Sequence, residues 1–126
     1  IVMANFLRID HIALHVRDLN TSREFYKSHF GFSDYYKQVT ASGIEIYYMK
    51  LGDTILELVG RHDLKIEGFH WCMETDDFDA AVSQLEKNKV KLIQEPHPTD
   101  AREPREQGWK RAVFEGPDGE HVEIRG

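Results

Sequence analysis

Hydrophobic and polar residues alternate in several short segments of this chain, and in four of them the polar face carries a histidine or a glutamate. Side chains point to alternate faces along a strand, so residues two apart share a face. Apolar residues occupy the opposite face in each case. The four residues are His11 in IDHIALHV, Glu57 in TILELVG, His70 in GFHWCMET and Glu123 in EHVEIRG. Two imidazoles and two carboxylates are a suitable ligand set for a divalent metal such as Zn, Ni, Co or Mn.

The first half of the chain predicts the order strand, helix and three strands. Asp18 or Asn20 can cap the helix at its start, and Gly31 is a good helix stop. Turn residues separate the strands that follow the helix. The expected strands are 8–16, 32–40, 44–51 and 54–59.

The second half predicts the same order. Asp76 or Asp77 can cap a helix in which apolar residues from Phe78 to Leu85 follow helical spacing. Gly116-Pro117-Asp118-Gly119 is a strong turn signal between the last two strands. The expected strands are 69–75, 91–94, 109–115 and 120–125. The segment 96–107, rich in Pro and charge, is expected to be a long loop of the kind that often binds ligands.

The order His, Glu, His, Glu indicates an internal duplication. When the two halves are aligned, His11 falls on His70, Asp18 on Asp77, and Glu57 on Glu123. A repeat of this length is a supersecondary module whose apolar face needs a partner. The chain of 126 residues therefore predicts one α+β domain of two tandem βαβββ modules, about residues 6–60 and 68–126. Helices are expected on one sheet face, with a concave polar face on the other.

The composition of the chain argues against several classes of function. The net charge of −6 argues against general affinity for nucleic acid or acidic membranes. No stretch is long and apolar enough to span a bilayer, and no charged-then-apolar leader is present. Cys72 is the single cysteine, which excludes an intramolecular disulfide and fits a cytoplasmic location. We expect Cys72 to be a small buried thiol rather than a nucleophile.

The segments IDHIALHVRDLNTSREFYKSHFGF and VFEGPDGEHVEI resemble the opening strand and helix and the closing hairpin of the vicinal oxygen chelate superfamily. That superfamily includes glyoxalase I, methylmalonyl-CoA epimerase, extradiol dioxygenases, and fosfomycin- and bleomycin-resistance proteins. The resemblance covers nearly the whole chain. It implies a glyoxalase-like fold, in which the modules form a curved, partly open mixed sheet with helices on its outer face.

The resemblance also implies the site. The family's metal ligands match His11, Glu57, His70 and Glu123, and a fourth ligand at Glu57 resembles glyoxalase I (lactoylglutathione lyase) and related epimerases. It implies a metal-dependent lyase or isomerase that acts through an enediolate on a small substrate with adjacent oxygens, such as a thiol-methylglyoxal hemithioacetal. Glu123 would move the proton, with Glu57 as its counterpart. The metal, which is Ni, Zn, Co or Mn, would polarise the carbonyl.

Several residues are candidates for substrate binding. Bacterial glyoxalase I carries Arg and Asn where this chain has His15 and Arg61, and both positions help to hold glutathione there, so the thiol carrier stays open. Tyr48 is expected to line the pocket, although most tyrosines near it belong to the core. Arg102, Arg105 and Lys110 can clamp an anionic group or simply be solvated. His15 and His121 either orient the ligands or the substrate, or are exposed residues at the ends of strands.

Other functions remain open. One is a different metalloenzyme of the superfamily, either an epimerase or a thiol transferase. Another is a non-catalytic small-molecule-binding or resistance protein on the same fold. The family suggests a homodimer, and the sequence does not decide whether the ligand pairs of one chain or of two chains combine.

Overall fold

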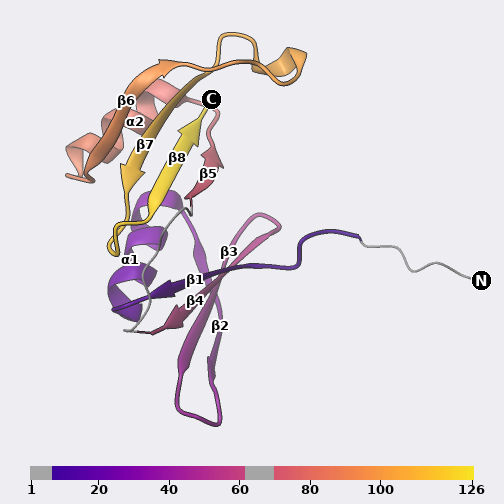
Figure 1. Cartoon of the computed structure of the whole chain (residues 1–126), viewed down its shortest axis with the longest axis vertical. Helices are drawn as coiled ribbons and strands as arrows, with labels where there is room; N and C mark the ends of the chain where they lie inside the picture. Colours follow the sequence, from indigo (N-terminus) through magenta and orange to yellow (C-terminus); the bar gives the residue numbers. More distant parts are fainter. Residues whose placement is uncertain (1–6, 62–69) are drawn as a thin grey trace, which may run out of the picture. The chain divides into compact units, whose positions relative to one another are not determined.

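The computed structural model describes residues 7–61 and 70–126. The chain forms two compact units, Ile1–Leu64 and Lys65–Gly126. Each unit has the order strand, helix and three strands that the duplication predicts (Figure 1). The segment that joins the predicted modules, together with the start of the strand expected from residue 69, lies outside the described residues. Each unit builds its own four-stranded mixed sheet, which confirms the α+β class.

In the first unit, the strand that directly follows His11 pairs with the strand that carries Glu57. The sheet order is β1-β4-β3-β2, with β1 parallel to β4 and the other neighbours antiparallel. The elements are β1 Ile12–Val16, α1 Leu19–Phe30, β2 Ser33–Val39, β3 Glu45–Leu51 and β4 Thr54–Gly60. The expected strand 8–16 is therefore shorter, and His11 lies directly before it.

The second unit repeats this topology as β5-β8-β7-β6, with β5 parallel to β8. Its elements are β5 His70–Glu74, α2 Phe78–Lys87, β6 Leu92–Pro98, the 3-10 helix Pro104–Glu106, β7 Lys110–Glu115 and β8 His121–Arg125. The strand expected at 91–94 continues to Pro98, so the loop predicted at 96–107 begins only after residue 98. Proline is tolerated there because β6 is an edge strand.

Each helix is capped at its N-terminus by an aspartate, and the two aspartates occupy corresponding positions in the two halves. Asp18 Oδ1 accepts a hydrogen bond of 2.9 Å from the Thr21 backbone N–H, and Asp77 Oδ1 accepts one of 3.1 Å from that of Ala80. Gly31 ends the first helix with φ 79°, a left-handed conformation that costs glycine little. Of the alternatives left open by the sequence, Asp18 and Asp77 are therefore the caps.

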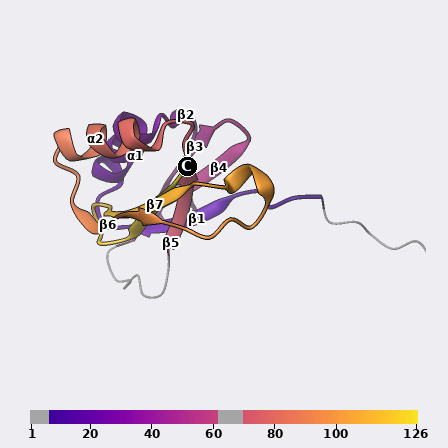
Figure 2. The same ribbon diagram turned by 90° about the horizontal axis from the view of Figure 1, so that it is seen from above.

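The helices cover the sheet faces opposite the four candidate ligands. α2 lies along one face of the second sheet (Figure 2), and its buried residues are Phe78, Val82 and Leu85. In the first unit α1 packs on β3 and β4. Leu56 and Leu58, which flank Glu57, have no exposed surface. Within the described residues, no helix combines the length and apolar character that crossing a membrane requires.

A buried carboxylate anchors the segment between β6 and β7. Glu106 is only 1 % exposed and accepts hydrogen bonds from the backbone N–H of Arg102 at 2.8 Å and from its Nη2 at 2.6 Å. Arg125 Nη2 on β8 lies 3.4 Å from Glu106 Oε1. These contacts, those of Arg102 first, lower the pKa of Glu106 to about 2. The segment is therefore tied to the sheet rather than free.

Leu58 tests the core of the first unit. Leu58→Ala should lower the free energy of unfolding by about 2 to 5 kcal/mol, because it removes a fully buried side chain and leaves a cavity. Urea denaturation measures the change. The control Val39→Ala, at a position that is 57 % exposed, should change stability by less than about 0.5 kcal/mol. Equal effects of the two substitutions would contradict this packing.

Glu106 predicts a pH dependence of stability. Its pKa is lower in the folded protein than its ordinary value of 4.5, so its ionised form stabilises the fold above about pH 4.5. That stabilisation is lost as the pH falls from 4.5 towards 2. Glu106→Gln should therefore unfold at a lower temperature than the original protein at pH 7, and the gap should narrow at pH 3. A gap that stays constant, as expected for the exposed control Glu86→Gln, would refute the anchor.

Candidate functional site

The first His–Glu pair is produced by the parallel register of β1 and β4. Ala13 is the register partner of Glu57, so His11, two residues earlier, lies on the same face. His11 Nε2 is 2.8 Å from Glu57 Oε2. The other ring nitrogen, Nδ1, lies 3.0 Å from Asp10 Oδ2, an arrangement that orients the imidazole.

The second pair forms in the same register. Cys72 is the partner of Glu123 across β5 and β8, and His70 lies two residues before it. His70 Nε2 is 3.5 Å from Glu123 Oε2. Glu123 is only 8 % exposed, which is unusual for a carboxylate. The structure thus brings together the two members of each predicted pair.

The donor atoms of both pairs suit a divalent cation. A deprotonated imidazole nitrogen and a carboxylate oxygen both present lone pairs, and a shared proton or cation removes their repulsion. Nitrogen and oxygen ligands of this kind suit Zn, Co, Ni and Mn. Among residues 7–61 and 70–126, no group of three or more His, Cys, Asp or Glu side chains could hold a metal. Each unit by itself therefore brings together one histidine and one glutamate of the predicted set.

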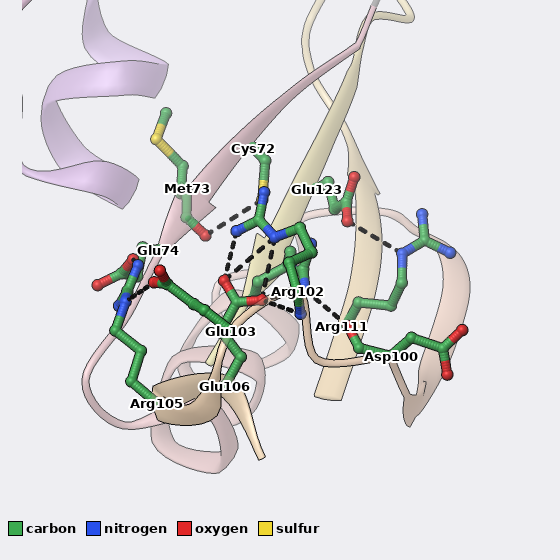
Figure 3. Close-up of polar contacts among 11 residues, drawn as sticks. Cys72, Met73, Glu74, Asp100, Arg102, Glu103, Arg105, Glu106, Arg111 and Glu123 are labelled. Atoms are coloured by element: carbon green, nitrogen blue, oxygen red, sulfur yellow. Dashed lines mark hydrogen bonds and ion pairs between the residues drawn. The ribbon is translucent and has the colours of Figure 1, made fainter. Parts of the chain in front are cut away.

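The two carboxylates have different neighbours. Glu57 faces Tyr48, its register partner on β3, whose ring centroid is 6.2 Å from that of His11. Burial raises the pKa of Tyr48, and the Glu57 carboxylate raises it further. Glu123 instead accepts a hydrogen bond of 3.0 Å from Arg111 Nε (Figure 3). One pair thus has a neutral phenol beside it and the other a guanidinium.

A cavity adjoins the position of each pair. In the first unit a cavity of about 330 Å³ is lined by Asp10, Tyr35, Tyr36, Gln38, Tyr48 and Ile55. In the second unit a cavity of about 370 Å³ is lined by His70, Cys72, Glu74, Arg102, Trp109, Glu123 and Arg125. The first thus has aromatic walls, and the second is polar. Both have a volume suited to part of a small organic ligand.

Cys72 is exposed, so the prediction of a buried thiol was wrong. It lies on the same face as His70 and Glu123 because it is the register partner of Glu123. Partial burial, followed by the charge of Glu123, raises the pKa of this thiol to about 11. Cys72 is therefore largely protonated at neutral pH, which argues against a nucleophilic role.

The predicted substrate-binding cations are mostly engaged by carboxylates. Arg102 is paired with Glu106 although it still lines the second cavity. Arg105 pairs with Glu103 and Glu74 (Figure 3).

The remaining candidates have different settings. The Lys110 ammonium lies 2.9 Å from Asp79. His15 lies half-buried on the face of His11, and Arg61 follows β4 and donates its backbone N–H to Val16. Tyr48 lines the first cavity.

Arg111 is the site residue that the sequence reasoning missed. Val113 on β7 is the register partner of Glu123, so Arg111, two residues earlier, is a diagonal neighbour on the same face. Once β7 and β8 are recognised as a hairpin closed by Gly116–Gly119, alternation alone places Arg111 beside Glu123. The neighbouring Lys110, which was singled out, points to the opposite face.

Comparisons with known proteins identify related sequences. Human mitochondrial methylmalonyl-CoA epimerase is 33% identical over 110 residues, which cover 72% of this chain and 59% of the epimerase. The chain therefore spans less than two thirds of that relative. The metallothiol transferase FosB of Staphylococcus epidermidis is 26% identical over 123 residues, covering 92% of this chain and 79% of that protein.

Solved structures show the same fold. A glyoxalase family protein from Enterococcus faecalis superposes with a TM-score of 0.74 at 19% identity, covering 96% of this chain and 98% of that one. The sequence model of one superfamily matches residues 8–124, which include both His–Glu pairs. The chain belongs to the Glyoxalase/Bleomycin resistance protein/Dioxygenase superfamily.

Proposed function

We propose that this protein is a metal-dependent enzyme that moves a proton at a carbon beside a carbonyl, as a glyoxalase I-like lyase or isomerase does. The observation that carries the proposal is the repetition of a His–Glu pair in an identical strand register. His11 lies beside Glu57 at 2.8 Å, and His70 beside Glu123 at 3.5 Å. A single His–Glu pair is a common polar contact. The occurrence of the same pair on the open face of both sheets indicates that the two pairs have a common function.

Each residue has a role in this proposal. His11 and His70 hold the cation through Nε2, and Glu57 and Glu123 complete the ligand set. The bound ion would polarise adjacent oxygens of the substrate. Glu57 or Glu123 accepts the proton from carbon and returns it, and a carboxylate on either side allows transfer on either face of the substrate. The pairs of one chain or those of two copies in a homodimer would combine.

The proposal defines a chemical class of substrate rather than one compound. The similarity to methylmalonyl-CoA epimerase favours proton transfer beside a thioester as the second candidate reaction, because that chemistry needs the same carboxylates. FosB, named a metallothiol transferase, supports a thiol transferase as a further alternative. His15 and Arg61 stand where bacterial glyoxalase I has other side chains, which argues against glutathione as the carrier. A cytoplasmic location, where thiols stay reduced, fits each reading.

Metal content tests the site. Protein purified without chelator should contain about one divalent ion for each set of two His–Glu pairs, and Glu57→Gln or Glu123→Gln should bind it roughly 10-fold to 100-fold more weakly. Metal analysis and competition with a chromophoric chelator measure this. The control Glu86→Gln, on the exposed face of α2, should keep full affinity. No uptake of Ni, Co, Zn or Mn would leave a binding protein instead of an enzyme.

A substrate panel tests the reaction. The metal-loaded protein should turn over methylglyoxal with at least one low-molecular-weight thiol, or exchange the proton beside the carbonyl of an acyl thioester with deuterium. Glu57→Gln and Glu123→Gln should each lower the rate by roughly 100-fold or more, because each removes a carboxylate able to move the proton. Metal uptake without turnover or deuterium exchange in the whole panel would exclude the lyase and the epimerase together.

A further inference from the structure

The guanidinium of Arg111 is held from two sides. Its Nε donates to Glu123 Oε1 at 3.0 Å, while its Nη1 lies 2.9 Å from Gln94 Oε1 and 3.3 Å from His97 Nε2. Gln94 and His97 both belong to β6, whereas Glu123 belongs to β8. We call Arg111, Gln94 and His97 the Arg111 bracket. The Arg111 side chain, at the centre of the bracket, connects the edge strand β6 to the carboxylate of Glu123.

An irregularity in β6 makes the bracket possible. Gln94 is the register partner of Val113, and His97 is that of Arg111, so three steps along β6 match two steps along β7. On a regular strand residues 94 and 97 would point to opposite faces. The register shift between them brings both side chains to the same guanidinium. Bulges of this kind occur beside active sites, where they re-aim a side chain.

The hydrogen bonds of His97 define its role in the bracket. Its Nδ1 is 2.9 Å from the backbone carbonyl of Glu95, which can only accept, so Nδ1 carries the proton. The other nitrogen, Nε2, is then a free acceptor and receives Nη1 of Arg111. His97 therefore holds the guanidinium as a neutral group. Substitution of Gln94 or His97 by leucine removes a brace without changing the formal charge of the site.

The two carboxylate oxygens of Glu123 have different partners. Oε1 is occupied by Arg111, and Oε2 points towards His70 Nε2. In the first unit the residue of β3 that stands directly opposite Glu57 is the neutral Tyr48, so the two pairs are not supported alike. An Arg–carboxylate contact fixes the plane of the carboxylate more firmly than a single neutral donor does.

We propose that Arg111 is a positioning residue that fixes Glu123 with one oxygen held and the other presented beside His70, and that Gln94 and His97 act through it. This inference rests on the proposed metal site. It predicts that metal affinity depends on side chains that touch no ligand of the ion. It also predicts that charge alone at position 111 does not suffice, because the fork geometry of arginine does the positioning.

The affinity of the protein for Co²⁺ tests the inference. Arg111→Lys keeps the charge but loses the fork, and should weaken Co²⁺ binding by roughly 10-fold, as substitutions of the groups behind metal ligands do. The double variant Gln94→Leu/His97→Leu should weaken it about threefold to tenfold. In an Arg111→Met background the same double change should have little further effect, because the braces act through Arg111. The matched control Arg23→Lys, which loses the forked contact with Asp34 but keeps the charge, should leave the affinity unchanged.

Other outcomes overturn the inference. Full affinity in Arg111→Lys, with tighter binding in Arg111→Met, would mean that Arg111 acts through its charge alone. Lower unfolding temperatures with unchanged affinity in all bracket variants would mean a structural role only. Additive effects of the Gln94→Leu/His97→Leu and Arg111→Met changes would show that the braces do not act through Arg111.

A metal-free measurement separates this inference from the proposed function. In the ¹H–¹⁵N NMR spectrum of the metal-free protein, the Nε–H of Arg111 should give a slowly exchanging signal that Arg111→Lys removes and thereby assigns. The signal should shift in Glu123→Gln and exchange much faster in Gln94→Leu/His97→Leu. If these NMR results are obtained with a protein that binds no metal, the contacts of the Arg111 bracket are confirmed and the proposed function is refuted. If the original protein binds metal but the signal ignores Gln94 and His97, the bracket falls alone.

Discussion

The parallel pairing of the first and last strands in each unit is the constraint on which the candidate site depends. Ala13 stands opposite Glu57, and Cys72 opposite Glu123, so each histidine lies two residues before the partner of its glutamate. Because side chains alternate along a strand, a slip of one residue would turn the glutamate into the apolar layer under the helix. The burial of Leu56 and Leu58 on one side therefore holds Glu57 on the other.

Equal registers do not produce equal sites. The His–Glu pairs correspond, and so do the aspartate caps of the two helices, but the next layer of side chains differs. Glu57 lies beside Tyr48, while Glu123 accepts a hydrogen bond from Arg111 on β7, whose guanidinium also contacts Gln94 and His97 of the irregular edge strand β6. The second unit also carries the Glu106 anchor, which ties the segment before β7 to Arg125 on β8. The two units thus share the His–Glu pairs and differ in the side chains around them.

Local patterns in the sequence predicted most of the fold. Alternation located the strands, Asp18 and Gly31 marked the ends of α1, and the alignment of the halves paired His11 with His70. The errors have physical causes. Proline at residues 96 and 98 suggested a loop, but an edge strand tolerates residues that cannot donate to a ladder. Cys72 was expected to be buried because cysteine usually is, whereas its register places it on the open face. Arg111 escaped notice because the hairpin of β7 and β8 was predicted without its register, and the register sets which residue lies beside Glu123.

The central proposal is that the two His–Glu pairs, of one chain or of two copies, are ligands of a divalent ion. X-ray absorption spectroscopy of the Co²⁺-loaded or Zn²⁺-loaded protein tests it most directly, because imidazole rings give a characteristic multiple-scattering signal. The account predicts two imidazole ligands per ion, with oxygen donors completing the shell, and one imidazole in His70→Ala. A first shell without imidazole, or one unchanged in both His11→Ala and His70→Ala, would contradict it.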